Sequence, residues 1–168
     1  LYEEIEPEEI TKHFKRDLGD LKIALHYGCH YLKPSGIYEN FDPADHPTSI
    51  EKLLSMTGAR VIRYAGEQNC CGGPLLPIDE KTALSLAKEK LDAVLDAGAD
   101  ALSVVCPFCS VMYDSNQKTM LSGSGTNSGL PVLYLTQLLG LAMGFGRKEL
   151  GLNLNVVKTK ELLKKYFT

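Results

Sequence analysis

The amino-acid sequence predicts an α/β fold with an open, mainly parallel sheet of about four strands and helices on both faces. Two observations support this prediction: four short apolar runs recur along the chain, and amphipathic patterns of helical length separate them. Parallel neighbours need crossover connections of a dozen or more residues, so this alternation favours a parallel sheet over a series of hairpins. The predicted architecture is Rossmann-like, and 168 residues suffice for one core.

The expected strands are short and rich in aliphatic residues. They cover residues 22–27, 60–64, 101–105 and 131–135. The run 130–146 is the most apolar part of the chain, but Pro131 and three glycines interrupt it. It therefore predicts a buried strand followed by a helix, and we expect no insertion into a membrane.

Two crossover helices have start and stop signals. Thr48 with Glu51 predicts a capping box for the first, and Gly58 predicts its end. Asp79 predicts the N-cap of a longer second helix, which Gly98 closes. The apolar face of that helix contains Leu84, Ala87, Leu91, Val94 and Leu95. Residues 33–47 and 121–129 show no regular period and are expected to form loops.

Composition excludes several classes of protein. Hydrophobic residues make up 44% and charged residues 23%, which is typical of a folded domain and not of a disordered chain. Lys and Arg number 18 against 21 Asp and Glu, giving a net charge of −3. This balance offers no basic field for nucleic acid or anionic lipid, so we expect no nucleic-acid partner.

The five cysteines follow the first three predicted strands. Cys29 comes after the first strand, the adjacent Cys70 and Cys71 after the second, and Cys106 and Cys109 after the third. The carboxyl ends of parallel strands share one edge of a sheet, where ligands bind. The sequence therefore predicts that all five sulfurs gather at that edge. An odd count with an adjacent pair is also unlike a secreted disulfide framework, and it predicts reduced thiols in the cytoplasm.

Several roles fit thiols in this pattern. A structural zinc takes four tetrahedral ligands, which an adjacent Cys–Cys pair supplies awkwardly, whereas a polynuclear iron–sulfur centre accommodates diverging side chains. Gly28, Gly72 and Gly73 would let the backbone approach such a centre and direct N–H groups at sulfur. A glutaredoxin-type dithiol at Cys106-Pro-Phe-Cys109 would leave three cysteines without a role. A purely structural role for all five is the remaining alternative.

The cysteine pattern resembles that of the cysteine-rich CCG domain, and its surroundings resemble the C-terminal half of the heterodisulfide reductase B subunit. The pattern is Cys29, then Cys70-Cys71-Gly72-Gly73, then Cys106-Pro-Phe-Cys109. Supporting segments are 26–31, 98–101 and 136–143, and the likeness covers residues 22–155. On this basis we expect a cysteine-rich iron–sulfur domain at 21–155, a C-terminal helix at 156–168, and at 1–20 a helical extension or the remnant of an upstream domain. A chain that opens with Leu1 suggests a fragment.

The resemblance implies an oxidoreductase that reduces a mixed disulfide of the coenzyme M–coenzyme B type, as in methanogenesis. It implies a non-cubane [4Fe-4S] cluster held by Cys29, Cys70, Cys71, Cys106 and Cys109, with His30 as the proton donor to the leaving thiolate. The implied partners are an upstream CCG domain, other reductase subunits that carry iron–sulfur clusters, and the small disulfide. The isolated fragment could instead hold zinc or no metal.

Two further functions fit the same sequence. The chain could be an electron-transfer subunit of another CCG-domain oxidoreductase of the thiol:fumarate, succinate or lactate type, or a zinc-bearing scaffold that docks partners. Among single residues, His26 is expected to be a packed core group, and Lys33 and Arg63 to be solvated rather than to orient an anionic substrate. The terminal helix could cover either its own domain or a partner.

Overall fold

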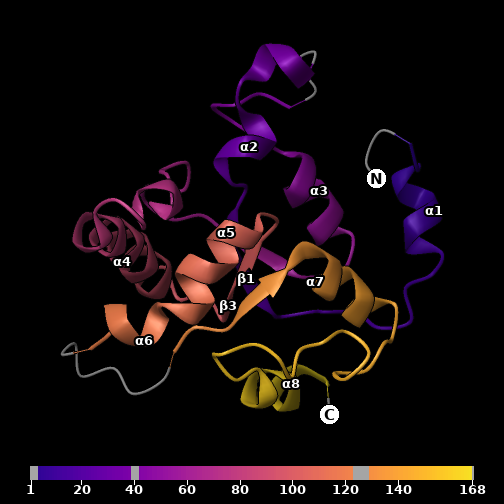
Figure 1. Ribbon diagram of the computed structural model, residues 1–168. Coiled ribbons are helices and arrows are strands. Elements are labelled where there is room, and N and C mark those ends of the chain that lie inside the picture. Colours follow the sequence, from indigo (N-terminus) through magenta and orange to yellow (C-terminus); the bar gives the residue numbers. More distant parts are fainter. Residues whose placement is uncertain (1–3, 39–41, 123–128, 168) are drawn as a thin grey trace.

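The sheet has four parallel strands in the order β2-β1-β3-β4. The computed structural model describes residues 4–38, 42–122 and 129–167. The strands are β1 (Lys22–His26), β2 (Arg60–Ile62), β3 (Ala101–Val104) and β4 (Val132–Tyr134). Helices lie on both sides of this sheet (Figure 1). The α/β class, the parallel sheet and the strand number expected from the sequence are therefore confirmed.

Each strand is shorter than expected at its carboxyl end. At β4 the cause is local: the backbone N–H of Tyr134 donates to Gln137 Oε1 at 2.9 Å, so the helix α7 (Leu135–Ala142) begins directly after the strand. Predicted loop 33–47 contains a 3-10 turn, Ser35–Tyr38. Most of the other predicted loop, residues 123–128, lies outside the described residues.

One face of the sheet carries α1 (Pro7–Thr11), α3 (Ser49–Ser55), α7 and α8 (Lys160–Phe167). Ile23 and Leu25 of β1 point into this core. The predicted capping box of α3 is wrong, because the Thr48 side chain makes no cap bond. Asp42 instead accepts the N–H groups of Thr48 and Ser49 at 2.9 to 3.1 Å.

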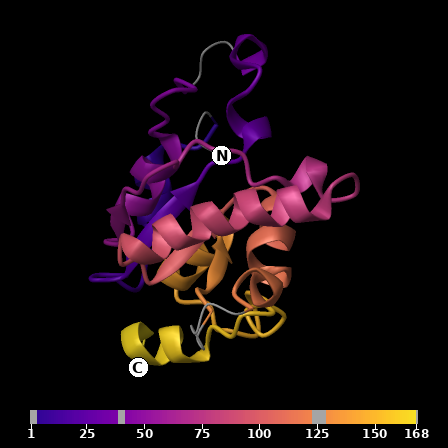
Figure 2. The same ribbon diagram turned by 90° about the vertical axis from the view of Figure 1, so that its left-hand side faces the viewer.

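The opposite face is covered by α4 (Glu80–Asp96), α5 (Pro107–Ser110), a π-helical turn (Val111–Ser115) and α6 (Gln117–Met120). Figure 2 shows the long helix α4 running across the sheet. Asp79 accepts the N–H of Thr82 at 3.0 Å, which confirms the predicted N-cap of α4. Side chains alternate along a strand, so Ala24 and His26 of β1 face α4 while their neighbours face α7. Within the described part of the chain, no helix is both long and apolar enough to cross a bilayer.

The C-terminal helix α8 packs on its own domain. Leu162 is buried against the α7 side of the core, and the Tyr166 hydroxyl donates to Asp100 Oδ2 at 2.7 Å. Asp100 also accepts from the backbone N–H of Lys22 and from Lys165 Nζ, both at 3.0 Å. Burial alone would raise the Asp100 pKa, but these hydrogen bonds hold it below its usual value. Asp100 therefore joins α8, β1 and the start of β3.

The variant Asp100→Asn should lower the free energy of unfolding by about 1 kcal/mol at neutral pH, because it removes the charge from three hydrogen bonds. A carboxyl whose pKa is lowered by folding stabilises the protein above its unfolded-state pKa, and this contribution is lost as pH falls through the folded-state pKa. The difference from wild type, measured by urea unfolding, should therefore shrink as pH falls below about 4 and vanish once pH lies below the folded-state pKa of Asp100. Asp20→Asn, at an exposed turn, is the matched control and should change stability little at either pH. An Asp100→Asn effect independent of pH would contradict the assigned role of the charge.

Candidate functional site

The cysteines lie on three loops that leave the carboxyl ends of β1, β2 and β3. Cys29 opens the short helix α2 (Cys29–Leu32), and only Tyr27 and Gly28 separate it from the end of β1. Cys70 and Cys71 stand in the connection from β2 to α4, just before the 3-10 turn Gly73–Leu75. Cys106 is the N-cap of α5, and Cys109 lies inside that helix.

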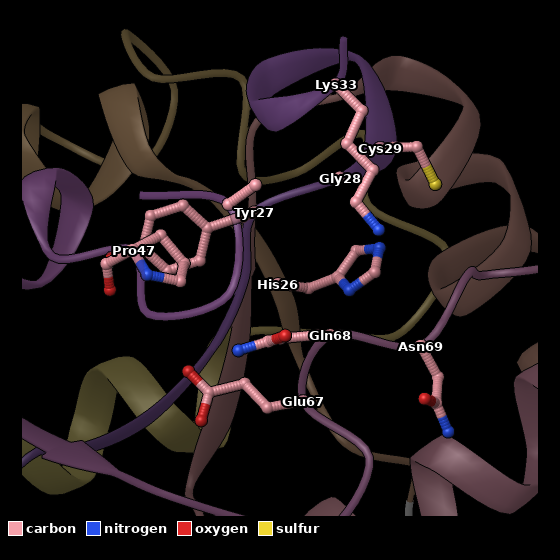
Figure 3. Close-up of a pocket in the computed structure, with 10 residues that line it drawn as sticks. His26, Tyr27, Gly28, Cys29, Lys33, Pro47, Glu67, Gln68 and Asn69 are labelled. Carbon is pink, nitrogen blue, oxygen red and sulfur yellow. The ribbon is translucent and has the colours of Figure 1, made fainter. Parts of the chain in front are cut away.

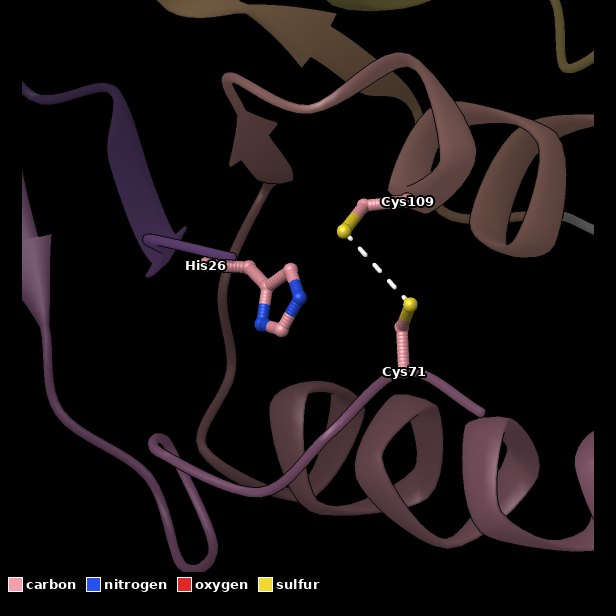
Figure 4. A group of neighbouring side chains, drawn as sticks. All are labelled: His26, Cys71 and Cys109. Carbon is pink, nitrogen blue, oxygen red and sulfur yellow. Dashed lines mark hydrogen bonds between the residues drawn. The ribbon is translucent and has the colours of Figure 1, made fainter. Parts of the chain in front are cut away.

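The thiols interact with one another across these loops. Cys109 Sγ donates to Cys71 Sγ at 3.5 Å, and both residues are buried (Figure 4). The Cys29 thiol interacts with those of Cys70 and Cys71, and Cys106 interacts with Cys109. Cys29 and Cys70 are exposed, whereas Cys106 is half-buried. The group therefore has a closed side at Cys71 and Cys109 and an open side at Cys29 and Cys70.

Backbone N–H groups point at two of the sulfurs. Gly72 N–H donates to Cys70 Sγ and Gly73 N–H donates to Cys71 Sγ, each at 3.4 Å. Gly72 has a φ of +76°, and a Cβ placed there would lie 2.7 Å from the carbonyl oxygen of Ala83 in α4. Glycine is therefore required at this position both for the backbone conformation and for the close approach of the loop to α4.

The buried pair behaves as a thiol beside a thiolate. The hydrogen bond from Cys109 lowers the pKa of Cys71, and the same bond together with burial raises the pKa of Cys109. Burial, followed by the proximity of Cys70, raises the pKa of Cys29. Metals bind thiolates rather than thiols, so a metal bound here would displace protons from these cysteines.

His26, at the end of β1, faces the buried sulfurs. Its ring stands edge-on to Tyr113, with ring centroids 5.3 Å apart, and its Nδ1 is 3.1 Å from Lys90 Nζ. One ligand atom from each of His26, Cys71 and Cys109 lies within 4.8 Å of the others. His26 Nε2 and the Tyr113 hydroxyl are buried without a hydrogen-bond partner among the described protein atoms. His26 is buried in the core as predicted, but its contact with the cysteines was missed. The available signal was strand alternation, which places His26 on the α4 face with Ala24.

Lys90 of α4 is a second residue whose place in the site was not predicted. It is only 3% exposed and lies on the face of α4 that also buries Ala83, Ala87, Leu91 and Val94. The signal was its position: Lys90 lies three residues after Ala87 and four before Val94, so it occupies the apolar stripe of the helix.

A cavity lies next to Cys29, beside the loop that follows β1. It is small, with a volume of about 30 Å³, which is roughly the space of one water molecule (Figure 3). Its lining residues come from the loops after β1 and β2 and from the segment before α3: His26, Tyr27, Gly28, Cys29, Lys33, Ala44, Pro47, Glu67, Gln68 and Asn69.

The remaining predicted residues have distinct surroundings. His30 follows Cys29 on α2 and is exposed. Lys33 is exposed and lines the cavity beside His26. Arg63 forms ion pairs with Glu51 and, at 2.7 Å, with Glu67, so its guanidinium group is already paired with two carboxylates.

The side chains present fit a centre built on soft metal ions. Two sulfurs bound to one tetrahedral ion at 2.3 Å would be about 3.8 Å apart, close to the 3.5 Å between Cys71 and Cys109. Five interacting thiols exceed the four ligands of a tetrahedral zinc, and N–H groups directed at sulfur are typical of sites that carry negative charge.

Comparison with known proteins connects this site to a family. The cysteine-rich domain model of the CCG family matches residues 23–114. The B subunit of the ferredoxin:CoB-CoM heterodisulfide reductase of Methanosarcina mazei is 37% identical over 169 residues, covering 99% of this chain and 56% of that protein. The membrane anchor subunit of the 8-methylmenaquinol:fumarate reductase of Wolinella succinogenes is 34% identical over 155 residues, covering 92% of this chain and 54% of that protein. The chain thus spans about half the length of these relatives.

The fold also recurs in a solved structure. The crystal structure of a hypothetical protein from Helicobacter pylori superposes with a TM-score of 0.66 at 16% identity, over 90% of this chain and 28% of that one. At this identity the likeness concerns the fold alone. The family match contains all five cysteines and extends over more than half of the chain. The chain therefore belongs to the CCG cysteine-rich domain family, as its cysteine pattern predicted.

Proposed function

We propose that this chain is the cluster-binding domain of a heterodisulfide reductase-like oxidoreductase. The proposed reaction is the reduction of a thiol–thiol mixed disulfide, of the coenzyme M–coenzyme B type, by sequential one-electron transfer. The observation that carries the proposal is the meeting of five thiols from three loops at one edge of the sheet. The name of the Methanosarcina relative supports this substrate class.

In this proposal Cys29, Cys70, Cys71, Cys106 and Cys109 hold a non-cubane [4Fe-4S] cluster. Five thiols, two of them adjacent in sequence, favour a polynuclear centre over a single ion. Such a centre, when bound, supplies one-electron transfer. Gly72 and Gly73 stabilise the negative charge on sulfur by donating their N–H groups. Buried Cys71 and Cys109 keep water from the inner side, and exposed Cys29 and Cys70 leave the outer side open to a disulfide.

His30 is the proposed proton donor to the leaving thiolate. It is exposed on α2 next to Cys29, where it can exchange protons with solvent between turnovers. Lys33 lines the small cavity next to Cys29, so it could contact an anionic group of a substrate that arrives at Cys29. His30 and Lys33 thus stand on the open side of the thiol group, where a substrate would arrive.

The catalytic unit is proposed to be larger than this chain. The relatives are nearly twice its length, and their names describe subunits of reductases. We infer that an upstream CCG domain and other iron–sulfur subunits complete the cleft and the electron path. The fumarate reductase relative supports a second candidate, in which the same centre only relays electrons for another CCG-domain oxidoreductase. The two candidates share the centre and differ in whether a disulfide reaches it.

Metal analysis tests the shared part of the proposal. Protein prepared without oxygen should contain about four iron and four acid-labile sulfide per chain. Cys71→Ser should sharply reduce both, because Cys71 lies at the buried centre of the group. Ser110→Ala, on the same helix as Cys109, is the control and should retain the iron. Stoichiometric zinc without sulfide would favour the scaffold instead.

A histidine variant separates a reductase from an electron relay. His30→Ala should retain iron and sulfide but slow disulfide reduction by about 100-fold, the scale typical for loss of a general acid. The measurement uses the chain joined to its upstream half, with an artificial one-electron donor. His13→Ala, also exposed, is the control. Loss of iron in His30→Ala would give His30 a role in holding the centre, and an unchanged rate would exclude it as the proton donor.

A further inference from the structure

The side chain of Lys90 extends from α4 toward the cluster of five cysteines. It leaves α4 on its buried face, and its ammonium nitrogen has three close neighbours. These are the carbonyl oxygen of Glu67 at 2.8 Å, the carbonyl oxygen of Asn69 at 2.6 Å and His26 Nδ1 at 3.1 Å. Glu67 and Asn69 belong to the loop that carries Cys70 and Cys71. Lys90 therefore connects α4, the Cys70–Cys71 loop and the end of β1.

The three neighbours match the three N–H groups of an ammonium ion. The two carbonyl oxygens can only accept hydrogen bonds, and the ammonium can only donate them. The third N–H is then directed at His26 Nδ1, which accepts it. Burial lowers the pKa of Lys90 to about 8, which still leaves the side chain charged at neutral pH.

The Lys90 contact settles which ring nitrogen of His26 carries the proton. An imidazole whose Nδ1 accepts must have its proton on Nε2 when the ring is neutral. Nε2 lies on the ring edge turned toward Cys71 and Cys109 (Figure 4), and it has no other partner among the described protein atoms. His26 therefore presents an N–H donor, not a metal-binding lone pair, to the sulfurs.

No carboxylate of the described residues pairs directly with the ammonium group of Lys90, and the Glu67 carboxylate acts on it only at longer range. Among the described residues, no ion pair joins Lys90 to an Asp or Glu side chain. The nearby cysteines, once ionised, favour its charged form, and Lys90 lines a pocket together with Cys70 and Asn69. Burying an ammonium ion is costly unless an opposite charge compensates it. Here the thiolates supply that opposite charge, together with the more distant Glu67 carboxylate.

We propose that Lys90 is a positioning residue of the thiolate centre: it fixes His26 as an Nε2–H donor to the buried sulfurs and supplies the positive charge that balances the thiolates. The inference deepens the proposed function and rests on it, because it assumes that these cysteines hold a metal centre. A positive charge beside that centre stabilises its more negative, reduced state relative to its oxidised state. Lys90 would thus hold the reduction potential high enough for the centre to accept an electron.

The potential of the reconstituted centre tests this charge effect. Lys90→Gln removes the charge but keeps a donor for the loop carbonyls. Its midpoint potential, measured by titration followed by electron paramagnetic resonance, should shift to more negative values by about 60 mV, which is a tenfold change in a one-electron equilibrium. Lys88→Gln is the matched control: it removes the same charge from the same helix, where Lys88 is partly exposed and pairs with Asp92. Its potential should stay at the wild-type value.

Binding of Co²⁺ to the metal-free protein gives a second readout that does not require cluster assembly. Thiols that become metal-bound thiolates gain negative charge, so loss of the Lys90 charge should weaken Co²⁺ binding by about tenfold, measured from the sulfur-to-cobalt absorption bands. A purely structural lysine would instead lower the thermal stability of the metal-free protein and leave the affinity of its folded fraction unchanged.

The protonation of His26 is directly observable. In the zinc-loaded or metal-free protein, imidazole nitrogen chemical shifts measured by NMR should show Nε2 protonated and Nδ1 accepting, and Lys90→Gln should shift the ring toward a mixture. A wild-type ring protonated on Nδ1 would overturn the inference, as would an unchanged potential together with unchanged Co²⁺ affinity in Lys90→Gln. Wild-type protein that binds neither cluster nor Co²⁺ would instead refute the proposed function, so the two failures are distinguishable.

Discussion

The thiols can meet only because the parallel strands of the sheet all end at the same edge. The pairing of β2, β1 and β3 places the loops after all three strands side by side, although their cysteines lie between positions 29 and 109 of the sequence. In the sheet, β1 lies between β2 and β3. The chain leaves β1 toward β2 and leaves β3 toward β4, so the loops after β1 and β3 run in opposite directions and the sheet has its switch point between these two strands. Cys29 and Cys106 stand on those two loops, at the edge where open α/β sheets bind ligands.

Gathering thiols creates an electrostatic problem that the surrounding residues address. Several thiolates in a partly buried space repel one another, and the hydrogen bond from Cys109 to Cys71, which lowers the pKa of Cys71 and raises that of Cys109, keeps one of this pair protonated. The N–H groups of Gly72 and Gly73 donate to the sulfurs of Cys70 and Cys71. Lys90 and His26, which are hydrogen-bonded to each other, lie between the sheet and the sulfurs. Cys29 stays exposed beside these donors. A centre held in this way would be shielded on one side and reachable on the other, which the proposed reduction of a substrate requires.

The two cores have different roles. The buried residues on the α7 side are mainly aliphatic and include no described cysteine, and Asp100 fastens α8 over this side. The α4 side contains Cys71, Cys109, Met112 and Tyr113 together with the buried polar pair His26 and Lys90. Burying a polar group lowers stability unless a partner compensates it. Polar groups buried next to a site are therefore more informative about function than the aliphatic packing on the opposite face.

Periodicity and local spacing were enough to predict the fold class, the approximate strands, the Asp79 cap and the grouping of the five cysteines in one pattern. They placed the start of α3 correctly at Thr48, but the capping hydrogen bonds come from Asp42, six residues away, and not from the expected local box. The meeting of His26 and Lys90 beneath the sulfurs, across 64 positions of sequence, emerged only from the folded arrangement. A lysine in an apolar stripe is visible in sequence, but its partner depends on how a helix crosses a sheet, and no local pattern encodes that crossing.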